Sequence, residues 1–199
     1  MVNANSGVVA ISDSPFVDFP PMAAEAADKV VMARAAFLDR DGVLVRLVDG
    51  RAPRTMDEFE PLYDAYDSVR RLRAAGLLVI VVTNQPDVAS GLITLDVMRA
   101  MNRELYELGV NDIFVCPHSA FDLCKCRKPK PGMLKQAASE WNIDLSRSFM
   151  VGDRDSDIEA GLAVGCTTIL IAPPSRWRAH IVVPSLREAV DRIIALCSR

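Results

Sequence analysis

The sequence has no apolar run of the roughly 20 residues that cross a bilayer, and no basic segment precedes an apolar one near its start. The second absence excludes a typical secretory signal. The 23 lysines and arginines are outnumbered by 26 aspartates and glutamates, and they are spread along the chain. Nucleic-acid-binding domains usually carry a clustered basic excess. We therefore expect a cytoplasmic protein with neither a membrane nor a nucleic acid as partner.

Glycine-rich phosphate loops are also missing. Neither Gly-x-x-x-x-Gly-Lys nor Gly-x-Gly-x-x-Gly occurs among the 10 glycines, which disfavours nucleotide-binding enzymes of the Walker and Rossmann types. Residues 1–33 show no regular apolar spacing and are interrupted by Pro15 and by Pro20-Pro21. We interpret residues 1–33 as a flexible leader and residues 34–199 as one domain.

Short apolar runs alternate with amphipathic segments along this domain. Runs typical of buried strands lie at residues 35–38, 77–82, 113–115, 149–151 and 167–171. Helical spacing of apolar residues lies at 64–75, 95–108, 133–141, 156–164 and 185–196. Thr94 and Ser185 are the predicted N-caps of two of these helices. The alternation predicts an α/β fold with a doubly wound, Rossmann-like parallel sheet, which binds ligands at the carboxyl ends of its strands.

Polar residues cluster at four places, three of them directly after predicted strands: Asp39 and Asp41; Thr83 and Asn84; Arg127 and Lys128; and Asp153, Arg154 and Asp157. Paired carboxylates can divide attack on phosphorus and proton transfer between them. A hydroxyl and a lysine can hold phosphate oxygens, and acidic residues after a glycine suit Mg²⁺. Taken singly, each motif is as well explained by a polar turn, a basic loop or helix-capping carboxylates. Their order along the chain points to one site.

This series resembles the four motifs of the haloacid dehalogenase (HAD) superfamily over residues 35–172. The resemblance implies a phosphatase in which Asp39 attacks phosphorus and forms an aspartyl phosphate. Asp41 would then be the proton donor and acceptor, and Thr83 and Lys128 would hold the phosphoryl oxygens.

The resemblance also implies a Mg²⁺ site. Its ligands would be Asp39, the backbone carbonyl of Asp41, and Asp153, while Asp157 would orient Lys128 or a metal-bound water. Predicted helices and strands already fill the intervals between the motifs. We therefore expect the HAD fold without a separate cap domain.

A dense set of metal-ligating residues precedes the lysine motif: Cys116, His118, Cys124 and Cys126. Three thiols and one imidazole suit tetrahedral zinc, and four protein ligands leave no position open for a substrate. Without an export signal, we expect a zinc-binding loop rather than disulfides. A free-thiol loop or a redox-active Cys-x-Cys pair is the alternative.

The zinc motif together with Cys126-Arg127-Lys128-Pro129 narrows the resemblance to the HAD phosphatases of heptose bisphosphate and histidinol phosphate. It implies hydrolysis of a sugar phosphate, D-glycero-D-manno-heptose 1,7-bisphosphate at its 7-phosphate, with Asn84, Arg127 and Arg154 on the substrate. The loop at residues 50–54 is either a further phosphate contact or a solvated turn. Histidinol phosphate, or another small phosphomonoester, is the second candidate substrate.

An alternative of another class is a zinc-stabilised interaction module without catalysis. The convergent charges of Asp39, Asp41, Lys128 and Asp153 argue against it. We expect the protein to act as a monomer.

Overall fold

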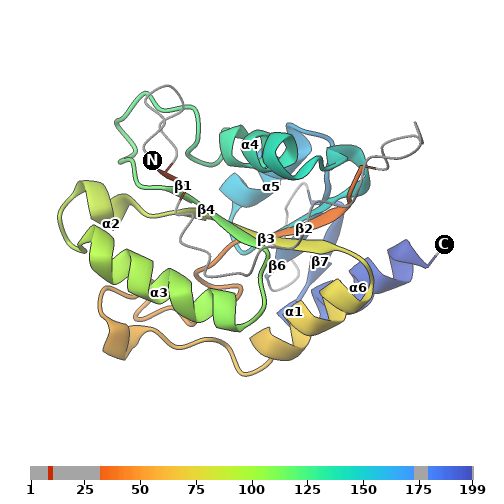
Figure 1. Cartoon of the computed structure of the whole chain (residues 1–199), viewed down its shortest axis with the longest axis horizontal. Helices are drawn as coiled ribbons and strands as arrows, with labels where there is room; N and C mark the ends of the chain where they lie inside the picture. The colour runs from red at the N-terminus through yellow and green to blue at the C-terminus, as the bar shows by residue number, and fades with distance from the viewer. Residues whose placement is uncertain (1–8, 11–31, 173–178, 199) are drawn as a thin grey trace, which may run out of the picture.

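The computed structural model describes residues 9–10, 32–172 and 179–198. Within them a seven-stranded sheet has the order β1-β4-β3-β2-β5-β6-β7 (Figure 1). Strands β2 to β7 pair in parallel, and β1 is antiparallel to β4. The predicted doubly wound parallel sheet is confirmed. The strands are β1 Val9–Ala10, β2 Ala35–Leu38, β3 Leu78–Asn84, β4 Asp112–Cys116, β5 Phe149–Gly152, β6 Thr167–Ile171 and β7 Ile181–Val183.

Helices cover both faces of the sheet, with α4 and α5 on one face and α1, α3 and α6 on the other (Figure 1). All five predicted helices are present, whereas α2, β1 and β7 are not predicted because they are too short to show a periodic pattern. The elements are α1 Ala65–Ala74, α2 Pro86–Ala89, α3 Leu95–Glu107, α4 Gly132–Trp141, α5 Asp155–Leu162 and α6 Leu186–Cys197, with 3₁₀ helices η1 Met56–Glu58 and η2 Leu145–Arg147.

The first predicted strand is apolar throughout because both of its faces are buried. In β2, Ala36 and Leu38 join the core cluster that contains residues of α1, α3 and α6. Ala35 and Phe37 join the opposite cluster, beneath α4 and α5. All four side chains are fully buried.

Two predicted N-caps are confirmed. The Thr94 hydroxyl accepts a hydrogen bond from the Val97 backbone N–H at 3.2 Å, and Ser185 accepts one from the Glu188 N–H at 3.3 Å. These bonds satisfy N–H groups that a helix start otherwise leaves unpaired.

The order in which the chain adds strands to the sheet changes direction at β2. It passes from β2 to β3 and β4 on one side, and then from β5 to β6 and β7 on the other. The carboxyl ends of β2, β3 and β5 therefore meet at a topological switch point, where ligands of such sheets bind. Among the described residues, the intervals between the motifs form no separate domain, as predicted for a fold without a cap.

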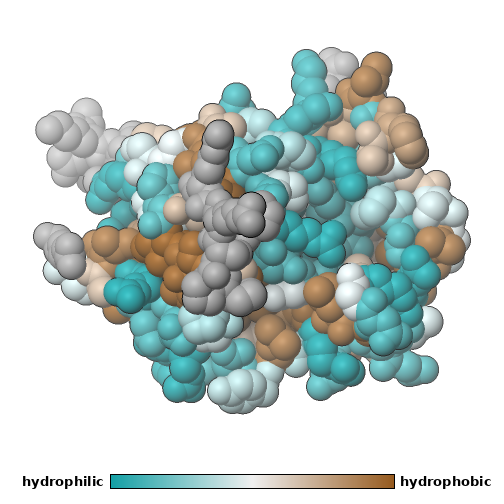
Figure 2. Space-filling view, turned by 180° about the vertical axis from the view of Figure 1, so that it is seen from behind, coloured by the Kyte–Doolittle hydropathy of each residue, from teal (hydrophilic) through white to brown (hydrophobic). Residues whose placement is uncertain are grey.

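The leader, residues 1–33, lies mostly outside the described residues, so its flexibility stays a prediction. Its described part includes β1 and Ala33, whose backbone N–H donates to the Asn142 carbonyl at 2.9 Å. No helix in the described ranges is long and apolar enough to span a membrane. Figure 2 shows hydrophobic surface in separate patches among hydrophilic side chains, as seen from behind.

Candidate active site

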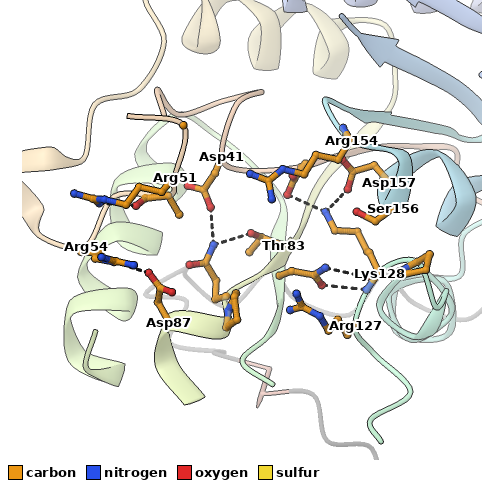
Figure 3. A pocket seen from close by; sticks show the side chains of 17 residues that line it. Asp41, Arg51, Arg54, Thr83, Asp87, Arg127, Lys128, Arg154, Ser156 and Asp157 are labelled. Carbon is orange, nitrogen blue, oxygen red and sulfur yellow. Dashed lines mark hydrogen bonds and ion pairs between the residues drawn. The ribbon is translucent and has the colours of Figure 1, made fainter. Parts of the chain in front are cut away.

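A cavity of about 480 Å³ lies at the carboxyl ends of the central strands (Figure 3). The predicted site residues that line it are Asp39, Asp41, Thr83, Asn84, Arg127, Lys128, Arg154 and Asp157. Asp153 joins them, because its carboxylate lies within 4.8 Å of those of Asp39 and Asp157. The four motifs are thus brought together at one place.

Lys128 is the cation at the centre of this site. Its side chain is 1% exposed, and its Nζ lies 2.8 Å from Asp39 Oδ1 and 2.6 Å from Asp157 Oδ1. Nζ also donates to the Val82 carbonyl at 2.7 Å. Burial lowers the pKa of Lys128, but the charges of Asp157 and Asp39 outweigh it, so the pKa lies above its ordinary value. A charged ammonium is therefore fixed beside the Asp39 carboxylate.

Asn84 holds the backbone of Lys128 in place. Its Nδ2 donates to the Lys128 carbonyl and its Oδ1 accepts from the Lys128 N–H, both at 3.0 Å. Both polar ends of the Asn84 amide are therefore engaged within the protein, although the side chain also lines the cavity. Its predicted substrate contact would be additional to this pairing.

Two residues outside the predicted set contact Asp41. Arg40 Nε donates to Asp41 Oδ1 at 3.0 Å, and Gln85 Nε2 donates to Asp41 Oδ2 at 2.6 Å. Gln85 Nε2 also lies within hydrogen-bonding distance of Thr83 Oγ1, at 2.9 Å (Figure 3). Only their positions in the sequence could have indicated this role: Arg40 lies between Asp39 and Asp41, and Gln85 directly follows Thr83-Asn84.

An acidic cluster fits the implied Mg²⁺. Asp153 Oδ1 is buried and has no hydrogen-bond partner among the described residues, and Arg154 Nε lies 4.0 Å from it. Burial, followed by the charge of Asp39, raises the pKa of Asp153 to about 6. A buried carboxylate oxygen without a hydrogen-bond donor is typically satisfied by a water or an ion, and Mg²⁺ prefers oxygen ligands. The carboxylate oxygens of Asp39, Asp153 and Asp157 are therefore suitable ligands for Mg²⁺.

Two glycines make room for these carboxylates. Gly42 has φ +88°, and a Cβ there would collide with the Asp153 carboxylate. A Cβ at Gly152 would collide with the side chain of Asp157. The sharp turn after Asp41 therefore depends on glycine for its backbone conformation and for space.

The far wall of the cavity carries paired charges. Arg51 donates two hydrogen bonds to Glu58, at 2.9 and 2.7 Å, and Arg54 Nε donates to Asp87 Oδ2 at 2.7 Å. Hydrogen bonding from Arg51 lowers the pKa of Glu58 to about 2. The loop at 50–54 is thus tied both to η1 and to α2.

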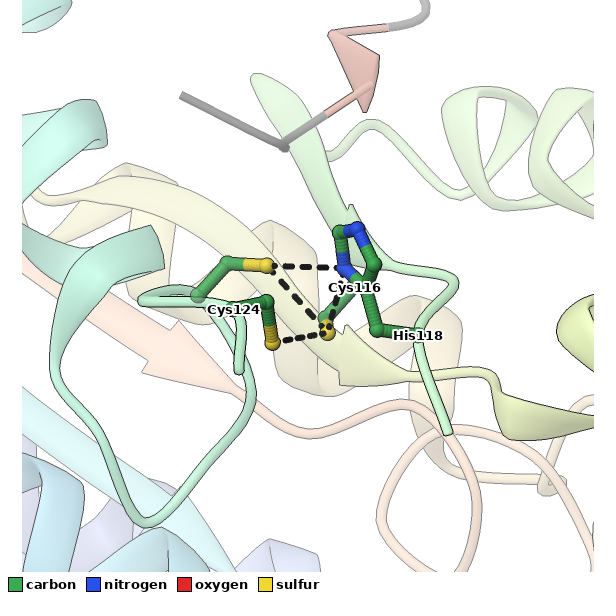
Figure 4. A group of neighbouring side chains, drawn as sticks. Cys116, His118 and Cys124 are labelled. Carbon is green, nitrogen blue, oxygen red and sulfur yellow. Dashed lines mark hydrogen bonds between the residues drawn. The ribbon is translucent and has the colours of Figure 1, made fainter. Parts of the chain in front are cut away.

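The four predicted zinc ligands also converge (Figure 4). Cys116 Sγ lies 3.5 Å from His118 Nδ1, 3.8 Å from Cys124 Sγ and 3.3 Å from Cys126 Sγ. A tetrahedron with Zn–S bonds of about 2.3 Å has edges of roughly 3.5–3.8 Å, close to these separations. Hydrogen bonding between Cys126 and Cys116, which outweighs burial, lowers the pKa of Cys126. The chemistry and spacing of this set fit zinc.

The cysteine cluster is connected to the cavity. Cys116 ends β4, and Cys126 directly precedes Arg127. Arg127 Nη1 donates to the His118 carbonyl at 3.2 Å. The position of this guanidinium at the cavity wall therefore depends on the loop that the four predicted zinc ligands enclose.

Comparison with known proteins agrees with this geometry. A family model described as HAD-hydrolase-like matches residues 125–189. The chain is 42% identical over 140 residues to the D-glycero-beta-D-manno-heptose-1,7-bisphosphate 7-phosphatase of Pseudomonas aeruginosa, covering 67% of this chain and 78% of the relative. It is 35% identical over 145 residues to the alpha-heptose counterpart of Photorhabdus laumondii, covering 66% and 78%.

A solved structure shares the fold. The D,D-heptose 1,7-bisphosphate phosphatase of B. bronchiseptica, complexed with magnesium and phosphate, has a TM-score of 0.73 and 30% identity, covering 82% of this chain and 99% of that one. The order of the motifs, their meeting at the switch point and these similarities agree with one another. The chain belongs to the HAD-like hydrolases, in the family of the heptose-1,7-bisphosphate 7-phosphatases, and it is a phosphatase.

Proposed function

We propose that this phosphatase works through an aspartyl phosphate on Asp39. The observation that carries the proposal is the ion pair between Asp39 and the buried Lys128, at 2.8 Å, on the floor of the cavity. An Asp39 oxygen attacks phosphorus in line, and the bond from phosphorus to the leaving oxygen breaks. Asp41 gives its proton to that oxygen. Asp41 then takes a proton from the water that attacks the aspartyl phosphate, which releases phosphate and restores Asp39.

In this mechanism Thr83 and Lys128 hold the equatorial oxygens of the phosphoryl group, where negative charge spreads in the transition state. Asp157 keeps Lys128 in position, since its carboxylate lies 2.6 Å from Nζ and is buried. Asp157 therefore acts through the lysine.

Family membership implies Mg²⁺, and the residues that would hold it are Asp39, Asp153 and the backbone carbonyl of Asp41. Bound there, Mg²⁺ would offset the repulsion between an anionic nucleophile and an anionic substrate. The buried Asp153 oxygen without a hydrogen-bond partner among the described residues supports this assignment.

The substrate that we propose is D-glycero-D-manno-heptose 1,7-bisphosphate, cleaved at its 7-phosphate. Arg127 and Arg154 line the cavity beside the predicted nucleophile, and guanidinium groups bind phosphate through paired hydrogen bonds. The second phosphate of a bisphosphate supplies such a partner. Histidinol phosphate has a single phosphate and is the competing substrate.

We also propose that Cys116, His118, Cys124 and Cys126 bind one structural zinc, which fixes the loop ahead of Arg127. The location that we propose is the cytoplasm, since a reducing compartment keeps thiols available as metal ligands. The monomeric state and the lack of nucleic-acid or membrane partners stay predictions from the sequence.

The substrate is tested by phosphate release with Mg²⁺ from heptose 1,7-bisphosphate, heptose 7-phosphate and histidinol phosphate. We expect kcat/KM for the bisphosphate to exceed that for the 7-phosphate about tenfold or more, because charged hydrogen bonds to the second phosphate are lost in the monophosphate. Arg127→Met should remove this preference, whereas Arg70→Met, on the exposed surface of α1, should keep it. Equal turnover of both sugars, or preference for histidinol phosphate, would overturn the proposed substrate.

A further inference from the structure

The two aspartates of the first motif have separate partners. Asp39 pairs with Lys128 Nζ and accepts the Arg40 backbone N–H, both at 2.8 Å. Asp41 instead accepts one hydrogen bond on each carboxylate oxygen, from Arg40 Nε at 3.0 Å and from Gln85 Nε2 at 2.6 Å. Asp41, the proposed proton donor, is therefore held at both carboxylate oxygens by the side chains of Arg40 and Gln85. The side-chain partner of Asp39 is a different residue, Lys128.

Arg40 is an unusual residue to find without solvent exposure. Its side chain is 0% exposed, its Nη1 donates to Asn102 Oδ1 at 3.4 Å, and its guanidinium lies 6.0 Å from the Phe59 ring centroid. Burying a charge costs free energy unless it is paired, and even a paired buried charge adds little to stability over an apolar residue. A reason other than packing is needed for a buried arginine whose carboxylate partner is Asp41.

Gln85 links Asp41 to two other parts of the site. Its side chain is buried, and Nε2 contacts both Asp41 Oδ2 and Thr83 Oγ1. Its backbone N–H donates to the Cys116 carbonyl at 2.7 Å, which anchors it to the end of β4. The dashed lines of Figure 3 show Asp41 and Thr83 meeting at this one amide nitrogen.

We infer that Arg40 and Gln85 are positioning residues for Asp41. They fix the direction of its carboxyl group so that it reaches the leaving oxygen of the substrate; the inference rests on the proposed role of Asp41 as proton donor. A proton donor must lie within hydrogen-bonding reach of the atom that it protonates. A misplacement of about 1 Å can lower the rate on the order of a hundredfold.

Leaving groups of different basicity separate this role from general support of the fold. The glycerol alkoxide that leaves glycerol 3-phosphate is strongly basic and needs a proton as it departs. The p-nitrophenolate that leaves p-nitrophenyl phosphate is weakly basic and departs without one. The ratio of kcat/KM for the two substrates reports the first phosphoryl transfer. Measured on one sample, this ratio does not depend on how much of the protein is folded.

The variant to measure is Gln85→Met, which has a similar volume but no hydrogen-bond donor. We expect kcat/KM for glycerol 3-phosphate to fall at least tenfold more than that for p-nitrophenyl phosphate, within the range of general acid catalysis. Asp41→Asn should shift the ratio in the same direction and further. Arg40→Lys, which keeps a cation but lacks Nε, should shift it too. Gln136→Met makes the same side-chain change on α4, where Gln136 contacts Glu140, and should leave the ratio unchanged.

An equal loss for both substrates in Gln85→Met, or no loss for either, would overturn the positioning role of Gln85. An unchanged ratio in Arg40→Lys would do the same for Arg40. If Asp41→Asn itself left the ratio unchanged, the proton-donor step of the proposed function would fail, and this inference with it. A shift in Asp41→Asn without one in Gln85→Met would overturn the positioning role alone.

Discussion

Lys128 Nζ lies 2.8 Å from Asp39 Oδ1, although the two residues come from distant motifs. Asp157 lies on the other side of the same ammonium, at 2.6 Å. The group expected to attack phosphorus is thus paired with the group expected to hold the phosphoryl oxygens. One buried cation balances two buried carboxylates at the centre of the site.

Removing this cation should destabilise the protein as well as inactivate it. Lys128→Met leaves Asp39 and Asp157 buried without a counter-charge, and breaking a buried pair in this way costs about 3–5 kcal/mol. Urea unfolding at pH 7 without Mg²⁺ measures the loss. The double variant Lys128→Met/Asp157→Asn removes one of the two stranded charges and should recover part of the stability. A double variant no more stable than the single one would contradict this account.

The turn after Asp41 should not tolerate a side chain. Gly42→Ala imposes a left-handed backbone conformation on alanine, at about 1–2 kcal/mol, and brings its Cβ against the Asp153 carboxylate. Gly76 is a matched control, since its φ is +79° but a Cβ there meets nothing within 4 Å. We expect both variants to lose similar backbone stability, and only Gly42→Ala to bind Mg²⁺ about tenfold or more weakly. Calorimetric titration with Mg²⁺ distinguishes them, and equal affinities would be inconsistent with the proposed site.

Magnesium binding should depend on pH through Asp153. Its pKa of about 6 lies above the ordinary value for aspartate, so the metal-free folded state holds a proton that the unfolded chain has released. The contribution of Asp153 to the stability of the metal-free protein therefore falls as pH rises from about 4 to 6. Below pH 6 a proton must also leave before Mg²⁺ binds, which weakens the apparent affinity about tenfold per pH unit.

Thermal unfolding with and without Mg²⁺ at pH 5 and pH 7.5 tests this dependence. The rise in melting temperature caused by Mg²⁺ should be larger at pH 7.5. Asp153→Asn should show little Mg²⁺ effect at either pH. An equal rise at both values in the wild-type protein would contradict the assignment of Asp153.

Loss of one cysteine ligand should affect turnover more than folding. Cys124→Ser removes a ligand that is only partly buried, and the enclosed loop carries the His118 carbonyl that holds Arg127. We expect a reduced zinc content by atomic emission and weaker turnover, with a small change in melting temperature. Cys197→Ser, at the end of α6, is the control and should keep its zinc. A full zinc equivalent in Cys124→Ser would count against the ligand set.

Features that depend on regular patterns along the chain are predicted correctly. The run at residues 35–38 is apolar because β2 is buried on both faces, and the four predicted zinc ligands lie close together along the chain, so their convergence was predictable. The buried place of Arg40 was not predicted, because a charged residue after a strand reads as solvent-exposed. Its burial depends on Asn102 and Phe59, which the tertiary fold brings to it.

The role of Gln85 was not predictable for a similar reason. It requires β3 and β4 to pair in a register that places the Cys116 carbonyl beside the Gln85 N–H. The pairing of Arg54 with Asp87 likewise joins the loop at 50–54 to α2, two segments that are separate in sequence. Strands β1 and β7 are too short to show alternation, so their pairing partners decide their conformation.

The most direct test of the central claim is phosphate release by Asp39→Asn compared with the wild-type protein. Both would be assayed with Mg²⁺ on the substrate that the wild-type protein turns over best. Asp96→Asn serves as the control, because its side chain is 90% exposed on α3. We predict that Asp39→Asn keeps its fold and loses turnover by a factor on the order of 10⁴ or more, as expected for a nucleophile, while Asp96→Asn keeps full activity. Turnover within tenfold of the wild type in folded Asp39→Asn would show that another group attacks phosphorus.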